Sequence, residues 1–278
     1  GLADLLPEGA GWADLVAPPA AFDALEELAR RCRHRERLAE TAGGGRGVRA
    51  LFTGPSGAGK TLAARLLGAE TGRDVCRADL SAIVDKYVGE TEKRLSALLS
   101  HAEALDVVLL LDEGDGLMAR RTDVRSSNDR FANLETDFLL QRLESHEGVV
   151  VVTTNMPEGI DPAFRRRMDV VVPFPRPDAP ARLALWRLHL PEDHAVAEGA
   201  LARIAARAAI TGGQIRNAVR AARSLALAED GPLDGDRLAR GLERELRKAG
   251  AMAGLPSPAR EGPPVDDLAA FAAALSAA

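Results

Sequence analysis

Short apolar runs alternate with longer amphipathic segments between residues 48 and 174. This alternation predicts strand–helix–strand units around a parallel sheet, and therefore an α/β domain. The runs VVLLLD and GVVVVTTN show no polar alternation in their apolar parts, which is typical of strands covered by helices on both faces. We therefore expect these two strands in the middle of the sheet. Five strands are predicted, over residues 48–53, 74–78, 107–112, 149–154 and 169–173.

The pattern changes after residue 173. The segment FPRPDAP contains three prolines in seven residues, and only helix-length amphipathic segments follow, over residues 179–189, 197–209, 213–228 and 234–248. We therefore predict a large α/β domain over residues 1–176 and a small helical domain over residues 177–249. The remaining residues, 250–278, are rich in Pro, Gly and Ala and are expected to form a flexible tail.

The segment LFTGPSGAGKT joins the first predicted strand to a helical segment, the context in which the pattern GxxxxGKT forms a phosphate-binding loop. Its glycines let the backbone wrap so that N–H groups point at phosphate. Lys60 is expected to contact the β and γ phosphates, and the Thr61 hydroxyl to ligate Mg²⁺. The alternative is a glycine-rich turn with a surface lysine. The predicted nucleotide-binding residues are Gly54, Pro55, Ser56, Gly57, Ala58, Gly59, Lys60, Thr61 and Leu62.

Polar groups also end the two central strands, at the edge where ligands of open α/β sheets bind. Asp112 is placed to hold Mg²⁺ through water, and the carboxylate of Glu113 can polarise an attacking water. An acidic pair in an ordinary loop is the alternative. Asn155 follows the other central strand, where it can sense the γ-phosphate or orient water, or else form an Asx turn before Pro157.

Composition limits the classes of protein that this chain can belong to. Hydrophobic residues make up 46% and charged residues 28%, as in globular proteins. The formal net charge is −5, which argues against broad electrostatic binding to nucleic acid or to a membrane surface. The two cysteines, Cys32 and Cys76, are too sparse for a disulfide or metal framework.

No run approaches the roughly 18 apolar residues of a spanning helix, and the first residues lack the order of a signal peptide. We therefore expect a cytoplasmic protein that does not span a membrane. Because the chain begins at Gly1 rather than Met, the sequence leaves open whether other residues precede it.

Taken together, the segments GPSGAGKT, LLLDEGD, TTN and IDPAFRRRMD resemble the AAA+ ATPases, and the likeness extends over residues 12–248. The resemblance implies a five-stranded parallel αβα P-loop domain, with the P-loop strand at its centre, followed by a small helical lid domain. It also implies that ATP and Mg²⁺ bind between the subunits of a ring, usually a homohexamer.

In that family Asn155 corresponds to sensor 1, Arg216 in GGQIRN to sensor 2, and Arg166 and Arg167 to the arginine fingers that reach a neighbouring subunit's γ-phosphate. Three consecutive arginines, with Arg165 the first, cannot all be buried without partners, and a phosphate of the adjoining subunit would supply the missing charge. The sequence does not decide which arginine is the finger. The alternatives are a solvated basic turn for the triplet and an exposed helix arginine for Arg216.

Two further segments resemble parts of the same family. The segment WADLV is similar to the stretch that packs against adenine, which would place Asp14, Leu15 and Val16 near the base with Ile215 of the lid opposite. The segment KYVGETEKRL resembles the pore loop of the clade that includes katanin and spastin. The expected pore-loop residues, which would grip a polypeptide in the central channel, are Lys86, Tyr87, Val88 and Gly89.

The alternative for Tyr87 is ordinary packing under the helix expected over residues 90–104.

Within the superfamily, the chain is similar to bacterial AAA+ proteins that are encoded with extracellular contractile injection systems. The segments that carry this resemblance are KYVGETEK, DVRSSNDRFANLETDFLLQRLE and ALWRLHLP, and it implies a role in assembly, loading or recycling of the particle. Three classes of function therefore stay open: an ATPase that remodels or unfolds a protein client, a nucleic-acid motor or loader, and a nucleotide-gated assembly factor that threads nothing.

Overall fold

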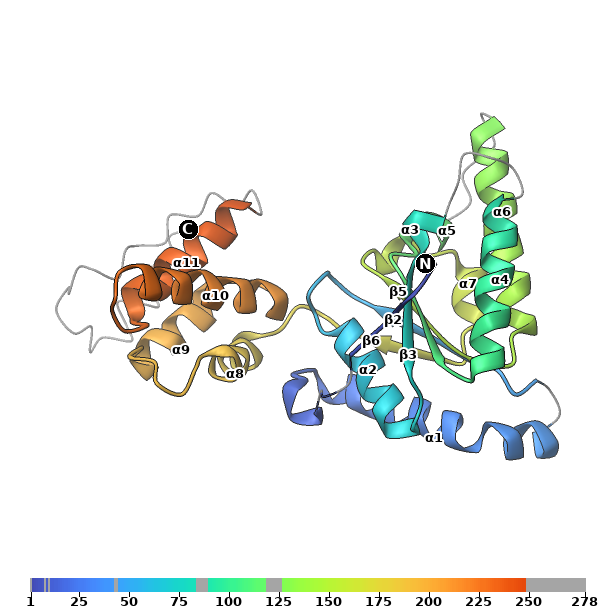
Figure 1. Cartoon of the computed structure of the whole chain (residues 1–278), viewed down its shortest axis with the longest axis horizontal. Coiled ribbons are helices and arrows are strands. Elements are labelled where there is room, and N and C mark those ends of the chain that lie inside the picture. Colours follow the sequence, from blue (N-terminus) through green and yellow to red (C-terminus); the bar gives the residue numbers. More distant parts are fainter. Residues whose placement is uncertain are drawn as a thin grey trace, which may run out of the picture. The chain divides into compact units, whose positions relative to one another are not determined.

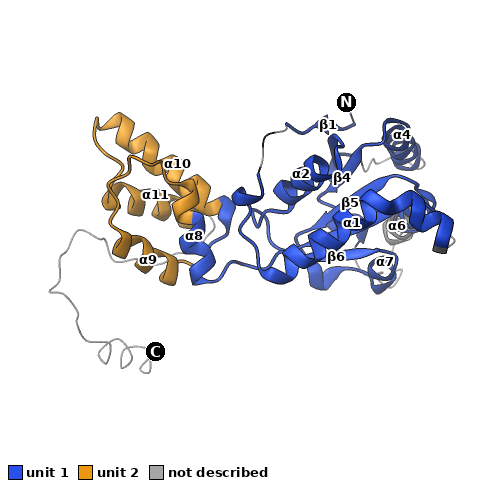
Figure 2. Ribbon diagram, turned by 90° about the horizontal axis from the view of Figure 1, so that it is seen from below, with its two compact units in different colours: residues 1–185, 209–213 blue, residues 186–208, 214–278 orange. Residues whose placement is uncertain are grey.

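The computed structural model describes residues 2–7, 9, 11–42, 45–83, 90–118 and 127–248. The chain divides into two compact units (Figure 2). Unit 1 comprises residues 1–185 and 209–213, and unit 2 comprises residues 186–208 and 214–278. The division falls within two helices, α8 (Ala179–His189) and α10 (Gly212–Ala228), and each of them therefore contributes residues to both units. The predicted tail over residues 250–278 lies outside the described part of the chain.

Unit 1 is built on a β-sheet with helices around it (Figure 1). The sheet has six strands in the order β1-β3-β4-β5-β2-β6. The strands after β1 are mutually parallel, and the short β1 pairs with β3 in the antiparallel sense. The predicted α/β class is therefore confirmed, and the five predicted parallel strands are present as β2 to β6. The sheet has a sixth strand, because the short antiparallel β1, which was not predicted, adds to the edge of β3. The strands are β1 (Asp4–Leu5), β2 (Val48–Thr53), β3 (Val75–Asp79), β4 (Val108–Asp112), β5 (Val149–Thr154) and β6 (Val170–Pro173).

Two features of this order bear on the sequence predictions. The apolar strands β4 and β5 occupy the middle of the sheet, as expected. The expectation that the P-loop strand lies at the centre is wrong, because β2 lies between β5 and β6. Both β4 and β5 are inserted between β2 and β3, so β6 is the one strand that lies beyond β2.

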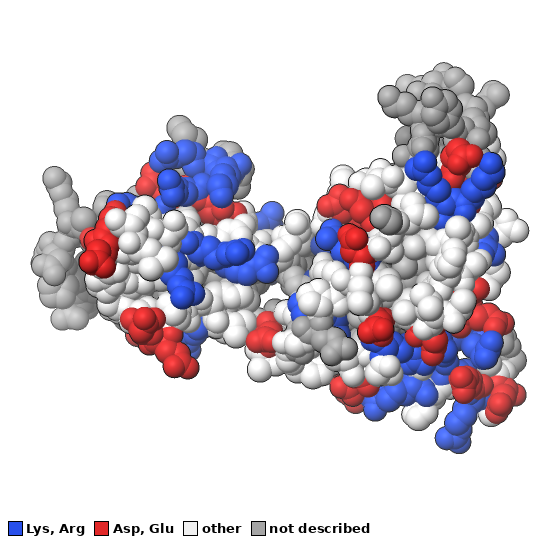
Figure 3. Space-filling model, in the orientation of Figure 1, with Lys and Arg blue, Asp and Glu red and all other residues white. Residues whose placement is uncertain are grey.

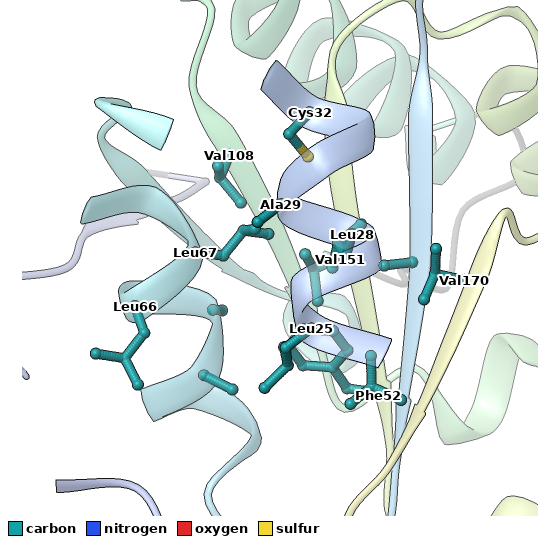
Figure 4. Close-up of a cluster of buried hydrophobic side chains, with 14 of the residues drawn as sticks. Leu25, Leu28, Ala29, Cys32, Phe52, Leu66, Leu67, Val108, Val151 and Val170 are labelled. Carbon is teal, nitrogen blue, oxygen red and sulfur yellow. The ribbon is translucent and has the colours of Figure 1, made fainter. Parts of the chain in front are cut away.

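The helices of unit 1 cover both faces of the sheet. They are α1 (Pro19–Ala42), α2 (Lys60–Thr71), α3 (Leu80–Ile83), α4 (Glu90–Leu105), α5 (Asp115–Met118), α6 (Ser127–Ser145) and α7 (Pro162–Arg166), with short 3-10 turns η1 (Trp12–Asp14) and η2 (Pro157–Gly159). On one face α1 and α2 pack against β2, β4, β5 and β6 (Figure 4). On the other face α3 to α7 pack against the alternate residues of the same strands.

This two-sided burial explains the unbroken apolar runs. In β4, Val108 and Leu110 belong to the core under α1 and α2, whereas Leu109 and Leu111 belong to the opposite core, and all four are fully buried. Cys32 of α1 is part of the first core, and burial raises the pKa of its thiol to about 11. Within the described part of the chain, no helix has the length and apolarity needed to cross a membrane.

Unit 2 consists of helices joined by short connections. After the last turn of α8 come α9 (Glu198–Arg207), α10 (Gly212–Ala228) and α11 (Gly235–Lys248), close to the predicted bounds. Their buried side chains include Trp186 and Leu242. The helices α10 and α11 approach closely at Gly241, where an added Cβ would lie 2.3 Å from the carbonyl oxygen of Ala218.

Replacing Gly241 by alanine is therefore expected to force α10 and α11 apart. Overpacking of this kind costs about 1–3 kcal/mol, and the helix-forming advantage of alanine returns up to about 1 kcal/mol. We expect chemical denaturation to show a lower free energy of unfolding. The matched control is Gly235→Ala, since a Cβ at Gly235 meets nothing within 4 Å. Equal stability of the two variants would contradict the close approach.

Candidate functional site

The polar groups singled out in the sequence meet at one edge of the sheet. The register pairs Thr53 of β2 with Thr154 of β5 and Leu111 of β4 with Val152 of β5, so these strands end at nearly the same level. The P-loop follows β2, the acidic segment that begins with Asp112 lies at the end of β4, and Asn155 follows β5. The expected convergence at the carboxyl edge is therefore observed.

The glycines of the loop over residues 54–59 are required by its geometry. Gly54 has φ +141°, and an added Cβ would lie 1.9 Å from the carbonyl oxygen of Phe174. Gly59 caps the start of α2 with φ +106°, a conformation that residues with a side chain rarely adopt. A Cβ at Gly59 would also lie 3.0 Å from Leu15 Cδ1, so Leu15 packs against the loop.

Lys60 opens α2 and is 6% exposed. Its Nζ donates hydrogen bonds to the carbonyl oxygens of Gly54 (2.5 Å) and Pro55 (3.0 Å) and to Oδ1 of Asn155 (2.9 Å). Burial lowers the pKa of Lys60, and the negative charges of Asp112 and Asp115 oppose this shift. The ammonium group is thus held beside the loop that would bind phosphate.

Asp112 ends β4 and is 9% exposed. Its Oδ2 accepts a hydrogen bond from Arg77 Nε (2.8 Å), and its Oδ1 accepts hydrogen bonds from the Thr153 hydroxyl and from the Glu113 N–H (3.2 Å). Glu113 has φ +57°, so the chain turns sharply at this residue, and its side chain is exposed at the sheet edge. The two carboxylates are therefore in different environments: Asp112 is fixed by three donors, and Glu113 faces solvent.

Asp115 was not singled out from the sequence, yet it connects the loops after β4 and β5. Its Oδ1 accepts hydrogen bonds from the Thr154 hydroxyl (2.5 Å) and from the Asn155 N–H (3.0 Å). The Thr154 hydroxyl also accepts from the Met156 N–H (3.0 Å), in the turn before Pro157. The side-chain oxygen of Asn155 meanwhile accepts from Lys60, so this residue faces the P-loop. Asp115 is the second aspartate of LLLDEGD, and its position close to the acidic pair is the sequence signal that could have identified it.

The three consecutive arginines lie at the end of α7, whose start is capped by the Asp161 side chain. Arg167 pairs with Glu144 and donates to the carbonyl oxygen of Ala163 (3.1 Å). Arg165 and Arg166 are exposed. The triplet thus contains one arginine held by its own chain and two that point to solvent.

The remaining predicted site residues are distributed more widely. Asp14 is exposed and accepts from the Gly11 N–H (2.8 Å), and Val16 is half-buried. Ile215 and Arg216 lie on α10 in unit 2, the first buried and the second exposed. The predicted pore-loop residues, 86–89, lie outside the described part of the chain. Their roles stay predictions.

The residues at the sheet edge fit a nucleotide accompanied by Mg²⁺. Gly54, Gly57 and Gly59 all have positive φ, and because glycine has no side chain they leave the loop backbone accessible to phosphate. The buried ammonium group of Lys60 provides a counter-charge for phosphate. The carboxylate of Asp112 and the hydroxyl of Thr61 are hard oxygen ligands of the kind that Mg²⁺ prefers.

Comparisons with known proteins agree with this geometry. The family model described as "ATPase family associated with various cellular activities (AAA)" matches residues 50–176. The chain is 31% identical over 146 residues to the 26S proteasome subunit RPT4 of Saccharomyces cerevisiae, covering 50% of this chain and 33% of that protein. It is 35% identical over 138 residues to human Fidgetin-like protein 1, covering 48% of this chain and 20% of that protein.

The structure is similar to a crystal structure of the FIGL-1 AAA domain, with a TM-score of 0.67 and 21% sequence identity over 90% of both chains. At this level of identity the likeness concerns the fold. The chain spans about a third or less of the length of the two curated relatives named above.

Asp115→Ala is expected to destabilise unit 1. The change leaves the Thr154 hydroxyl, in a residue that is 1% exposed, and the Asn155 N–H without their acceptor, and buried donors that lose a partner cost about 1–3 kcal/mol. Asp115→Asn keeps one side-chain oxygen and should lose less. The free energy of unfolding from urea denaturation is the measurement, and an alanine variant as stable as the wild type would count against this role of Asp115.

Proposed function

Since residues 50–176 are a domain of the AAA ATPase family, we propose that this chain binds ATP with Mg²⁺ at the carboxyl edge of the sheet and hydrolyses it in order to remodel a protein client. AAA ATPases generally bind ATP and Mg²⁺ and typically form hexameric rings. The observation that carries the proposal is the contact of Lys60 with Asn155 across two loops, beside the acidic segment 112–115.

Each group at this edge has a defined task in the proposed reaction. Lys60 neutralises charge on the β and γ phosphates, and the P-loop N–H groups orient them. Glu113 accepts a proton from the attacking water as the water oxygen bonds to the γ phosphorus and the bond to the β–γ bridging oxygen breaks. Asn155 orients the γ-phosphate or the water. Bound Mg²⁺ supplies further neutralisation of phosphate charge, with Thr61 and Asp112 as the residues that would hold it.

Glu113→Gln tests this assignment. Glutamine keeps the size and hydrogen bonding of the side chain but cannot take the proton, so we expect ATP binding within a few-fold of wild type and hydrolysis reduced by at least about 100-fold. Lys60→Ala is the contrasting variant, because it should lose binding itself. Nucleotide affinity and phosphate release are the two measurements. Turnover like that of the wild type in Glu113→Gln would remove Glu113 from the mechanism.

We further propose that the ring is a homohexamer in which Arg166 completes the neighbouring subunit's site. Its exposure supports this choice over Arg167, which is already paired with Glu144 and the Ala163 carbonyl. An arginine supplied in this way stabilises transition-state charge and accelerates related nucleotide hydrolases by about 10³ to 10⁵.

The arginine assignment predicts complementation in mixed rings. Arg166→Ala subunits have intact P-loops, and Lys60→Ala subunits have intact arginines, so each should be nearly inactive alone. We expect a mixture to recover ATPase activity, because a neighbour supplies each missing group. Arg167→Ala is the matched control and should lose less activity. Crosslinking shows whether mixed rings form. If they form and their activity does not exceed that of the separate variants, the proposal that Arg166 completes the neighbouring subunit's site is contradicted.

A protein is the client that the observations favour. One relative is by its name a 26S proteasome subunit, and the predicted pore-loop residues, which lie outside the described part of the chain, resemble those that grip polypeptide. On the face seen in Figure 3, acidic and basic side chains are interspersed on both units, which favours a protein client over a nucleic-acid motor or loader.

A nucleotide-gated assembly factor is the remaining alternative. The relatives named above do not support a link with a contractile injection system, and a client from such a particle rests on the sequence resemblance alone. Whether the proposed ring threads its client or only changes shape with nucleotide depends on the same pore-loop residues.

A further inference from the structure

Arg77 forms an ion pair with Asp112, the carboxylate assigned to Mg²⁺. The guanidinium Nε lies 2.8 Å from Asp112 Oδ2. We propose that Arg77 is a positioning residue that acts through Asp112 and weakens the coupling between Mg²⁺ binding and nucleotide binding. This inference rests on the proposed ATP site, and it assigns a role to a residue outside the motifs that define that site.

The sheet places Arg77 on the same face as the nucleotide loop. Arg77 of β3 pairs with Leu110 of β4, and Asp112 lies two residues further along β4. Residues two apart on a strand point to the same face, and Leu110 belongs to the core under α1 and α2. Arg77 and Asp112 therefore lie on the face of the sheet that is covered by α2, the helix that begins at the end of the P-loop.

Two cations act on Asp112: Arg77, which donates a hydrogen bond to it, and Lys60, whose pKa is lowered by burial and raised in part by the charge of Asp112. The other two hydrogen-bond donors of Asp112, the Thr153 hydroxyl and the Glu113 N–H, are neutral and both bind Oδ1. Among these three donors Arg77 is the charged one, and it binds the opposite oxygen. The Asp112 side chain is 13% exposed, so its charge is poorly screened by water, whereas the Arg77 side chain is 41% exposed.

The charges around this edge indicate the direction of the effect. Asp112, Glu113 and Asp115 bring three carboxylates within four residues, and Lys60 and Arg77 oppose them. Without the charge of Arg77, the edge would repel a nucleotide that carries no metal and would attract Mg²⁺ more strongly. Both changes increase the ratio of the nucleotide dissociation constant without Mg²⁺ to the constant with Mg²⁺. This ratio measures the coupling between the two ligands.

The experiment measures this ratio by calorimetry for the full chain and the non-hydrolysable analogue AMP-PNP, once with Mg²⁺ and once with EDTA. Arg77→Gln keeps a hydrogen-bond donor but removes the charge, and we expect the ratio to increase about tenfold, a value that allows for partial screening of an exposed guanidinium. Arg77→Lys keeps the charge and should stay within about twofold of wild type.

The matched control is Arg49→Gln. Arg49 of β2 also pairs with an aspartate, Asp169 (3.0 Å), but both lie near the amino ends of their strands, away from the P-loop edge. This variant should lose stability without changing the ratio. A lower melting temperature of Arg77→Gln with an unchanged ratio would show a purely structural ion pair and overturn the inference. A lower ratio would overturn it as well.

The wild-type chain separates failure of this inference from failure of the proposed function. If wild type binds no AMP-PNP, or binds it equally with and without Mg²⁺, the proposed site is wrong and the role of Arg77 falls with it. If wild type shows coupling that Arg77→Gln does not increase, the proposed site stands and the role of Arg77 is wrong.

Discussion

The parallel register of β2, β5 and β4 is the constraint on which the rest of this molecule depends. It brings Thr53, Thr154 and Asp112 to the same edge of the sheet, so that loops distant in sequence begin side by side. A shift of one residue in any of these strands would move its apolar residues from one core to the other. Since both cores accept apolar side chains, the polar residue that ends a strand discriminates between registers: a one-residue shift of β4 would turn Asp112 toward the opposite core. The observed register keeps Asp112 at the edge and assembles the candidate site.

Much of this arrangement could be predicted because its signals are local. The glycine spacing of the P-loop, the apolar runs of β4 and β5, and the polar residues that end them are all visible in short stretches of sequence. The P-loop lysine, the acidic pair and Asn155 were therefore expected at the edge where the structure places them. Lys60 and Asn155, 95 residues apart, are joined by a hydrogen bond.

The features that were missed depend on pairing between distant segments. The position of β2 in the sheet follows from the insertion of β4 and β5 between β2 and β3. The residues of β2 do not indicate which strands lie beside it, so its position could not be predicted from its own sequence. The strand β1 has two residues and exists only because β3 offers it an edge. Arg77 is an unremarkable polar residue in a predicted strand until β3 and β4 pair and place it diagonally from Asp112.

A buried ammonium group is costly unless polar partners compensate the loss of water. Lys60 meets this requirement with two carbonyl oxygens of its own loop and the side-chain oxygen of Asn155. A phosphate bound to Lys60 would compete with these acceptors. Nucleotide binding and the hydrogen bond between Lys60 and Asn155 therefore use the same donor, the ammonium group of Lys60. Asp115 holds the backbone of Asn155 from the other side, which limits how far this loop moves when the contact changes. The same few hydrogen bonds that stabilise the sheet edge thus give the loop after β5 a physical means of responding to nucleotide.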